Sequence, residues 1–402
     1  MVNWLPNVMF VATTDSYLKW AVGLNDLIPQ SWRTSLVLVK SLQNPSLRQI
    51  ELAVGEKNSD SIVREHVFAT VRRVMRTKPD IIVVAATGPF LVLFRWLLDM
   101  TPQGSQVKLV SGSPGIAYHL VGAPLRARTS ADLLLMAGKA ELERIAGALK
   151  AMSVNTKLAL ATLPFLNAAS SKPKHPGPEV LIFAPQPDMP KTLEDRQKVL
   201  IELSRLRKEF PALRIIVKLR AIEGEAQTHF EAHPYPRLAE ELAELGLISA
   251  GDFEFEVGSI SEFLKNSNAT LVTVSSTAAL ESLAMGNSTQ IISDFGVEDA
   301  LANAVFEDSG LVWNIRDYGL ARLQKPNQVW LEKNYFHKKS EDNWVQALSQ
   351  LTESKRVSPK RIFPTNIGKS LLFGEFLRVI FPNAVGIALI KYLKLVLGKN
   401  SS

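Results

Sequence analysis

Short apolar runs rich in β-branched residues alternate with longer amphipathic segments along most of the chain, and this alternation constrains the fold more than any other feature. Parallel strands need a crossover connection of a dozen or more residues, which is usually a helix. The pattern therefore predicts an α/β protein with parallel, doubly wound sheets. The expected strands are 8–12, 35–39, 81–85, 107–110, 131–135, 180–184, 214–218, 269–274 and 290–292. The expected helices are 17–27, 61–76, 90–100, 139–149, 193–210, 237–245 and 261–265.

Chain length and a proline-rich interruption predict two domains. A chain of 402 residues is long for one domain and comfortable for two. Residues 164–178 carry four prolines among Ser and Lys with almost no apolar periodicity, and they predict a linker. We therefore expect a first domain over 1–163, a second over 179–365 and a helical tail over 366–402. The apolar run 371–397 predicts a crossover helix that packs back on the first domain, and an amphipathic helix at a membrane surface is the alternative.

Charge and residue usage exclude several kinds of site. The formal net charge is +7, from 46 Lys and Arg against 39 Asp and Glu, and this modest excess suits an anionic ligand or an acidic membrane surface. No dense basic block indicates nucleic acid. The chain has no cysteine, which excludes disulfides, thiolate catalysis and cysteine-ligated metals. Residues 1–12 do not resemble a signal peptide, and we expect a cytoplasmic protein, at the inner face of the membrane if the tail binds there.

The most informative motif is ATLVTVSSTAALESLAMG at 269–286, which predicts a strand, three consecutive hydroxyl residues and then a helix. Ser275, Ser276 and Thr277 stand where that helix begins, just past the carboxyl end of the strand. Helix starts leave N–H groups unpaired and carry partial positive charge, and open α/β sheets bind ligands at this edge. The motif predicts a phosphate site, and the alternative is that Ser275 or Ser276 only caps the helix.

This segment, followed by a glycine and the strand 290–292, resembles the donor-binding segment of GT-B-fold glycosyltransferases. The likeness is to bacterial sialyltransferase-like, capsule-polymer and uncharacterised glycosyltransferase families, and non-hydrolysing nucleotide-sugar epimerases share a similar segment. The resemblance implies two Rossmann-like domains that face a cleft, with a nucleotide-sugar donor held by the second. It also implies that an acidic residue here, Glu281, holds a ribose hydroxyl; a solvent-facing Glu281 is the alternative.

Two cations at the exit of the strand 214–218 are candidates for the donor's phosphates. Lys218 and Arg220 alternate along the chain and so point to one side. They could neutralise a diphosphate or a carboxylate, which Arg can hold with two hydrogen bonds, and a solvated strand end is the alternative. His229, in the loop that follows, is a rival phosphate contact.

An inverting transfer needs a base that takes the proton of the acceptor hydroxyl, and the first domain should supply it. Asp15 is the first candidate, because it follows the strand 8–12 and precedes a helix; the alternative is that it caps that helix. His119, after the loop 112–115, is the second candidate, although a lone His is more often structural. No Asp-x-Asp pair occurs, so cations and a helix start are expected to stabilise the leaving group without a metal.

These observations predict a nucleotide-sugar-dependent glycosyltransferase of polysaccharide biosynthesis, inverting and metal-independent, that takes no separate cofactor. Its partners would be the nucleotide sugar and a glycan or lipid-linked glycan acceptor, with no nucleic acid and with peripheral membrane contact through the tail. Two alternatives remain open: a nucleotide-sugar 2-epimerase, which would need no acceptor, and a non-catalytic sugar-binding or assembly module. The resemblance carries the reaction type, because fold alone would not.

Overall fold

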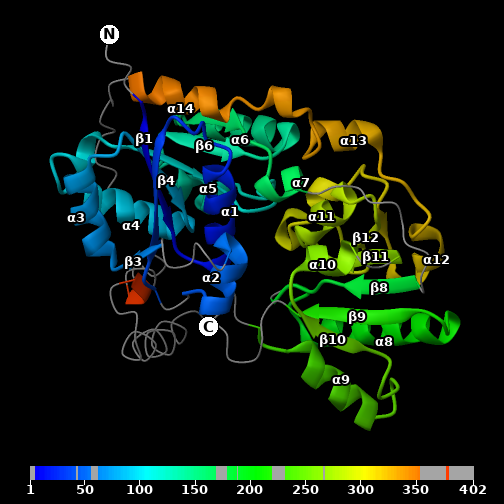
Figure 1. The fold of residues 1–402 in the computed structure, drawn as a ribbon. Helices are drawn as coiled ribbons and strands as arrows, with labels where there is room; N and C mark the ends of the chain where they lie inside the picture. Colours follow the sequence, from blue (N-terminus) through cyan, green and yellow to red (C-terminus); the bar gives the residue numbers. More distant parts are fainter. Residues whose placement is uncertain are drawn as a thin grey trace, which may run out of the picture. The chain divides into compact units, whose positions relative to one another are not determined.

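The computed structural model describes residues 5–41, 44–55, 62–168, 179–187, 189–219, 231–265, 268–353 and 377–379. The chain packs as two compact units, and Figure 1 colours it along the sequence. Unit 1 comprises residues 1–164 together with the chain from Lys338 onward, and unit 2 comprises 165–337. The expected linker begins in a short helix, α7 (Pro164–Ala168), and its remaining residues, 169–178, lie outside the described ones.

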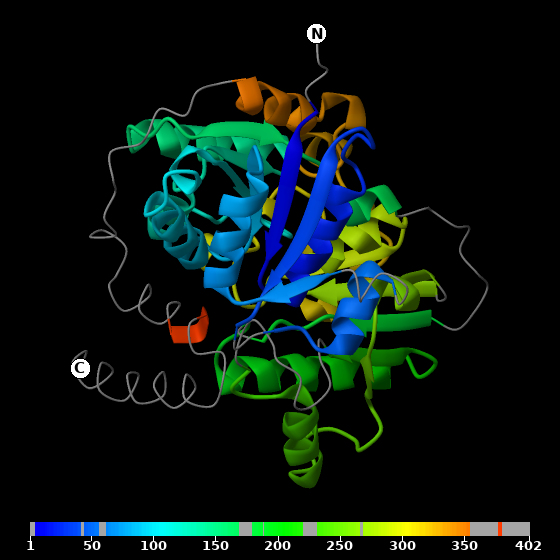
Figure 2. The same ribbon diagram turned by 60° about the vertical axis from the view of Figure 1, so that its left-hand side comes forward.

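Unit 1 is built on a seven-stranded parallel sheet. Its strands are β1 (Asn7–Ala12), β2 (Arg33–Val39), β3 (Val63–Glu65), β4 (Ile81–Ala85), β5 (Lys108–Gly112), β6 (Leu133–Met136) and β7 (Lys157–Leu160). Their order is β3-β2-β1-β4-β5-β6-β7, with Phe10 paired to Leu36 on one side and to Val83 on the other. Figure 2 shows β1 and β2 side by side. The order reverses between β1 and β4, so their carboxyl ends form the switch point where open α/β sheets bind ligands.

Helices cover both faces of this sheet. They are α1 (Asp15–Asn25), α2 (Leu47–Val54), α3 (Val67–Thr77), α4 (Gly88–Asp99), η2 (Gly104–Gln106), α5 (Gly122–Arg128), α6 (Lys139–Ala151), η6 (Lys339–Glu341) and α14 (Trp344–Glu353). Met9 and Val11 point into a core cluster with α3 and α4, whereas the alternate residues Val8 and Phe10 are buried on the other face. Figure 1 shows α3 and α4 on one side of β1 and β4, and α1 on the other.

The helix expected over 61–76 is wrong in its first part. Val63–Glu65 is the strand β3, and α3 begins after His66, whose ring accepts a hydrogen bond from the backbone two residues on (3.5 Å). Val63 pairs with Val37 of β2, so this β-branched residue extends the sheet. The elements α2, α5 and β7 had no counterpart among the expected ones.

The chain returns to unit 1 after unit 2 and closes the β7 side of its sheet. The backbone N–H of Thr162 donates to Asp342 (3.0 Å), and the N–H of Leu160 donates to Asn343 Oδ1 (2.8 Å). α14 follows at once and buries Trp344, Leu348 and Leu351. We expected the second domain to extend to residue 365, whereas this segment packs in unit 1 because its hydrogen bonds and apolar side chains lie there.

Most of the expected tail lies outside the described residues. Within 366–402 the structure describes 377–379, which are helical. Val379 is 1% exposed and belongs to the same core cluster of unit 1 as Met9 and Val11. Across the ranges that the structure describes, no helix combines the length and the apolarity needed to cross a membrane.

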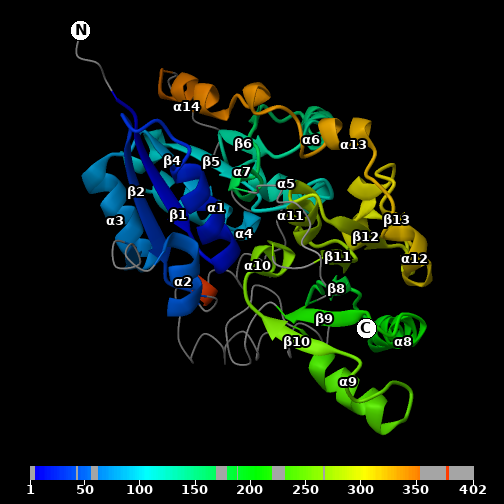
Figure 3. The same cartoon turned by 45° about the vertical axis from the view of Figure 1, so that its right-hand side comes forward.

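Unit 2 has a second parallel sheet, with the order β10-β9-β8-β11-β12-β13. Its strands are β8 (Glu179–Phe183), β9 (Arg214–Leu219), β10 (Glu254–Val257), β11 (Asn268–Thr273), β12 (Ser288–Ile292) and β13 (Val312–Trp313). The helices are α8 (Leu193–Glu209), α9 (Tyr235–Glu244), α10 (Ile260–Lys265), α11 (Ala278–Ala284), η3 (Asp299–Leu301), η4 (Ala304–Phe306), η5 (Ile315–Asp317), α12 (Tyr318–Ala321) and α13 (Gln328–Lys333). Figure 3 shows α8 beside β8 and β9. This is the Rossmann strand order, and its switch point lies between β8 and β11.

Candidate functional site

The carboxyl ends of β8 and β11 are fastened to each other at the switch point of unit 2. The buried hydroxyl of Thr273 donates to the carbonyl of Ala184 (2.7 Å). The same oxygen accepts from the N–H of Ser276 (3.2 Å). The loop that leaves β11 is therefore fixed before the hydroxyl residues begin.

Ser275 holds this edge together and does not present its hydroxyl to solvent. It is 3% exposed, and its Oγ donates to the side-chain oxygen of Gln186, in the loop after β8. The side-chain amide nitrogen of Gln186 donates to the carbonyl oxygen of Ser275 (3.5 Å). The side-chain oxygen and nitrogen of Gln186 therefore both bond to Ser275. Ser275 thus acts here as a positioning residue, which differs from its expected place in direct contact with a phosphate.

Ser276 and Thr277 are half-buried at the start of α11. Ser276 Oγ accepts from the N–H of Ala278 (3.2 Å), so Ser276, rather than Ser275, makes the local bond between a hydroxyl and the backbone at this helix start. Thr277 occupies the N-cap position, but its side chain makes no capping hydrogen bond. Glu281 lies in the first turn of α11 and is half-buried. Of the three hydroxyl residues, Ser276 and Thr277 are half-buried and Ser275 is buried.

The neighbouring strand β9 places Lys218 at the same edge of the sheet. Its Nζ donates to the carbonyl of Leu219 (2.8 Å), and the side chain is half-buried. Arg220 and His229 lie outside the described residues, so their expected roles stay predictions.

A buried arginine, which the sequence pattern does not indicate, fixes the loop after β8. Arg196 of α8 is 1% exposed; its Nη1 donates to the carbonyls of Gln186 (3.3 Å) and Pro187 (3.1 Å). Its Nη2 pairs with Glu231, and its guanidinium lies 4.2 Å from the ring centroid of Tyr235. No local pattern distinguishes this residue, because most helical arginines are exposed.

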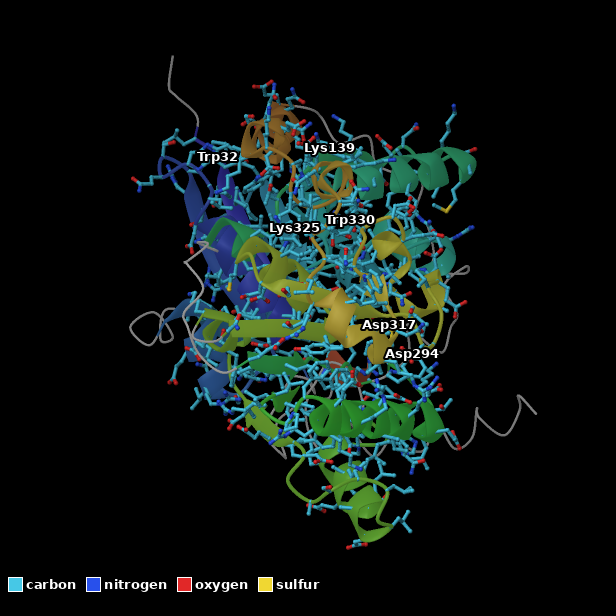
Figure 4. The ribbon with its side chains drawn as sticks, turned by 90° about the vertical axis from the view of Figure 1, so that its right-hand side faces the viewer. Trp32, Lys139, Asp294, Asp317, Lys325 and Trp330 are labelled. Carbon is cyan, nitrogen blue, oxygen red and sulfur yellow. The ribbon has the colours of Figure 1, made fainter. Side chains whose placement is uncertain are left out.

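Asp294 adds a carboxylate beyond the end of β12. Its Oδ2 accepts from the N–H of Ile315 (2.8 Å), the first residue of η5. Figure 4 labels Asp294, together with Asp317 at the end of η5. The carboxylate therefore anchors η5, a role that its local sequence does not indicate.

In unit 1, Asp15 is the first residue of α1, at the carboxyl end of β1. The N-cap is Thr14, so the alternative that Asp15 is the cap is wrong. Asp15 Oδ2 accepts from Lys19 (3.1 Å), while Oδ1 is buried and has no hydrogen-bond partner among the described residues. Among the described residues, the Asp15 carboxylate is thus paired through one oxygen only.

His119 belongs to the loop 113–121, which leaves β5 and is held in place by a carboxylate. Glu141 is 1% exposed; Oε1 accepts from the N–H of Ala117 (2.6 Å) and Oε2 from the N–H of Ala137 (2.8 Å). The loop's path is thereby tied to the exit of β6. His119 itself is half-buried.

Arg128, the last residue of α5, lies under the same edge of unit 1. It is 5% exposed, and its Nη1 donates to the carbonyl of Gly112 (2.7 Å) and to Ser111 Oγ (3.1 Å). Its Nη2 donates to the hydroxyl of Tyr17 (2.8 Å). Arg128 therefore connects the exit of β5 to α1. Within the described ranges, no three His, Asp or Glu side chains are grouped closely enough to hold a metal.

Comparison with known proteins agrees with this architecture. A family model described as "Putative glycosyltransferase (DUF6716)" matches residues 8–351. A comparison with curated proteins found no match.

Solved structures with the same two-unit GT-B fold include three bacterial or archaeal proteins. The MnaA protein of S. aureus, solved with UDP, has 11% identity and a TM-score of 0.57 over 89% of this chain and 100% of that one. A UDP-GlcNAc 2-epimerase from Neisseria meningitidis, bound to UDP-GlcNAc, has 9% identity and a TM-score of 0.56 over 86% and 99%. The UDP-GlcNAc 2-epimerase of Methanocaldococcus jannaschii has 12% identity and a TM-score of 0.57 over 86% and 99%. At these identities the likeness establishes the fold.

Proposed function

The chain belongs to the "Putative glycosyltransferase" family, and on that premise we propose that it transfers a sugar from a nucleotide-sugar donor to a glycan or lipid-linked glycan acceptor. The observation that carries the proposal is the extent of the match, which spans both sheets, from β1 to α14. The three structural neighbours were solved with, or are named for, UDP or a UDP-sugar, and we extend that ligand class to this chain as part of the proposal.

We place the nucleotide and its phosphates on unit 2, at the switch point between β8 and β11. Ser276 and Thr277 supply hydroxyl groups there, and Lys218 supplies a cation from β9. Glu281 accepts hydrogen bonds from the ribose diol. The hydrogen bond between Ser275 and Gln186 fixes the positions of these hydroxyl groups, and Ser275 itself does not contact the ligand. Arg220 and His229 remain further candidates for the phosphates.

We assign the base to Asp15 of unit 1, with His119 as the alternative. The acceptor hydroxyl gives its proton to Asp15 Oδ1 while its oxygen bonds to the anomeric carbon. The bond from that carbon to the phosphate oxygen breaks, and the nucleotide leaves with the electron pair. Attack on the face opposite the leaving group inverts the anomeric centre. Cations and backbone N–H groups stabilise the departing phosphate, so the proposed reaction needs no metal.

A donor panel tests this function. The full chain would be incubated with UDP-, GDP-, CDP- and CMP-sugars, with and without a glycan library, in buffer with EDTA, and nucleotide release and sugar products would be followed by chromatography. Acceptor-dependent release by the wild type, and its loss by about 10²- to 10⁴-fold in Asp15→Asn with unchanged donor affinity, is the expected result. Lys19→Gln is the matched control, because it removes the exposed partner of Asp15 and leaves the carboxylate.

Other outcomes of the same assay decide between the alternatives. Epimer formed from a nucleotide sugar without any acceptor would replace the transferase by a 2-epimerase. If the chain binds the donor without turnover, and Asp15→Asn binds it equally well, the protein would be a non-catalytic sugar-binding module. Activity that disappears with EDTA would refute the metal-independent mechanism.

The proposal includes peripheral membrane contact through residues 366–402, which would place the enzyme at the inner face of the membrane. Co-sedimentation of the full chain with anionic vesicles tests it, with Lys391→Glu/Lys394→Glu as the variant. Equal sedimentation of the wild type and the variant would refute membrane contact through residues 366–402.

A further inference from the structure

Among the described residues of unit 1, one buried arginine has no counter-charge. Three arginines of the described residues are at least 95% buried: Arg95, Arg128 and Arg196. Arg95 pairs with Asp99 (2.6 Å) and Arg196 pairs with Glu231. Arg128 meets only carbonyl and hydroxyl oxygens, with no carboxylate within ion-pair distance in the described part of the chain. A buried charge left uncompensated is costly, so a site of this kind favours an anion that comes from outside.

The Arg128 guanidinium also has N–H groups that no described residue accepts. Both N–H groups of Nη1 are used by three oxygen acceptors, and Nη2 donates to Tyr17 alone. The Nε–H and one Nη2–H of Arg128 have no acceptor among the described residues. In three arginine–glutamate pairs of this chain, the arginine donates to the carboxylate through Nε and Nη2. These pairs are Arg73–Glu65, Arg214–Glu254 and Arg316–Glu202. The Nε–H of Arg128 and the Nη2–H that Tyr17 does not use therefore remain for an oxygen ligand.

Neighbouring groups at the start of α1 supply more donors. The Tyr17 hydroxyl accepts from Arg128, and its own proton has no acceptor in the described ranges. Thr14 is 4% exposed and its Oγ1 is buried without a partner, so α1 begins with an N-cap residue whose side chain caps nothing. Thr14 is the N-cap residue of α1, an eleven-residue helix, and Tyr17 lies in the first turn of that helix. Asp15, the carboxylate that shares this helix start, is paired with Lys19 through Oδ2, and its Oδ1 has no partner among the described residues.

We propose that Arg128, Tyr17 and Thr14 form an anion subsite at the switch point of unit 1, and that it holds a carboxylate or phosphate group of the acceptor. The acceptor would then be an acidic glycan or a sugar phosphate, placed with a hydroxyl near Asp15. The identification of the ligand as the acceptor rests on the proposed function. Binding of an anion at the subsite can be measured without any turnover.

Ligand-observed NMR titrations on the full chain test the subsite directly. The probes are sodium glucuronate, glucose 6-phosphate and the neutral methyl ester of glucuronate, so that a carboxylate and a phosphate source are compared with an uncharged shape mimic. We expect at least one acidic probe to bind about tenfold or more tightly than the ester. Arg128→Met should abolish that preference, and Arg128→Lys should keep part of it.

The matched control is Arg126→Met, which removes the same charge from an exposed position of the same helix. It should leave the preference unchanged. Tyr17→Phe keeps the guanidinium and its three other contacts, so it tests the subsite even if Arg128→Met does not fold; it should weaken the acidic probe several-fold and not the ester. Equal binding of acid and ester by the wild type, or equal loss in both arginine variants, would overturn the inference.

A competition arm separates the acceptor from the donor. UDP at saturation should leave glucuronate or glucose 6-phosphate bound, whereas displacement by UDP, with weaker UDP binding in Arg128→Met, would assign the subsite to the donor's phosphates. A chain that keeps the anion preference but turns over no nucleotide sugar would refute the proposed function and leave the subsite. Turnover without the preference would refute the subsite alone.

Discussion

Gly112 ends β5 at a point where the chain has no room for a side chain. A Cβ built there would lie 2.7 and 2.8 Å from two ring carbons of Trp20 and 3.0 Å from the carbonyl oxygen of Leu135. Its backbone is not in the left-handed region, so the obstacle is purely steric. Gly112→Ala should therefore force the indole or the strand end to shift. Overpacking of this kind costs about 1–3 kcal/mol.

The same substitution at Gly147 provides a control, because there it should raise the free energy of unfolding. Gly147 lies inside α6, is exposed, and has nothing within 4 Å of the position that a Cβ would occupy. There Ala removes backbone freedom from the unfolded chain, which stabilises a helix by about 0.5–1 kcal/mol. The two variants make an identical chemical change in the same unit, so the effect on the unfolded chain is shared and their difference reports the two folded environments.

Thermal unfolding followed by circular dichroism at 222 nm, together with a urea titration, measures both variants. For a unit of about 200 residues, 1 kcal/mol corresponds to roughly 2–4 °C in Tm. Gly112→Ala should lower the midpoint by several degrees and Gly147→Ala should raise it by a few. Gly112 also gives its carbonyl to Arg128, so its variant should weaken the acidic probe as well. A neutral Gly112→Ala would refute the close packing of Trp20 against the end of β5.

Three further predictions follow from single contacts. Ser275→Ala removes the hydrogen bond to Gln186 and should cost about 1 kcal/mol in urea unfolding, with weaker UDP binding; unchanged UDP affinity would contradict its positioning role. The hydrogen bond from Arg316 lowers the pKa of Glu202 below 4.5, so its stabilisation is complete above that pH and is lost as the pH falls through the folded value. Glu202→Gln should therefore lower the free energy of unfolding most at pH 7 and least at pH 3, and equal losses at both values would refute this linkage. Asp15→Asn should leave Tm within about 1 °C while abolishing transfer, since one of its oxygens has no partner; a large loss of stability would make it structural.

The sheets were predictable because their strands are buried on both faces. Runs such as 8–12 and 81–85 are continuously apolar, and the helical segments between them impose parallel crossovers, so the central strands of both sheets follow from local pattern. The edge strand β3 was missed because its three residues, Val63–Glu65, are too few to establish a period of two against the helix that follows.

The polar framework of the candidate site was not predictable in the same way. Ser275 belongs to a motif that stands out in the sequence, yet its hydroxyl is used by Gln186, 89 residues away. Arg128, Arg196 and Glu141 lie on helices, where charged residues are usually exposed, and their burial depends on backbone carbonyls and amides contributed by distant strand ends. Local sequence therefore indicates which edge of a sheet binds a ligand more readily than which side chains support that edge.

The return of the chain to unit 1 has a consequence for synthesis on the ribosome. Unit 2 is continuous in sequence, whereas unit 1 needs the hydrogen bonds of Asp342 and Asn343 and the apolar face of α14. The nascent chain thus exposes Leu160 and its neighbours through the translation of more than a hundred further residues, during which unit 2 can fold as a complete body. A ribosome-bound fragment ending before residue 338 should therefore recruit chaperones through its first half, and a fragment ending after α14 should release them.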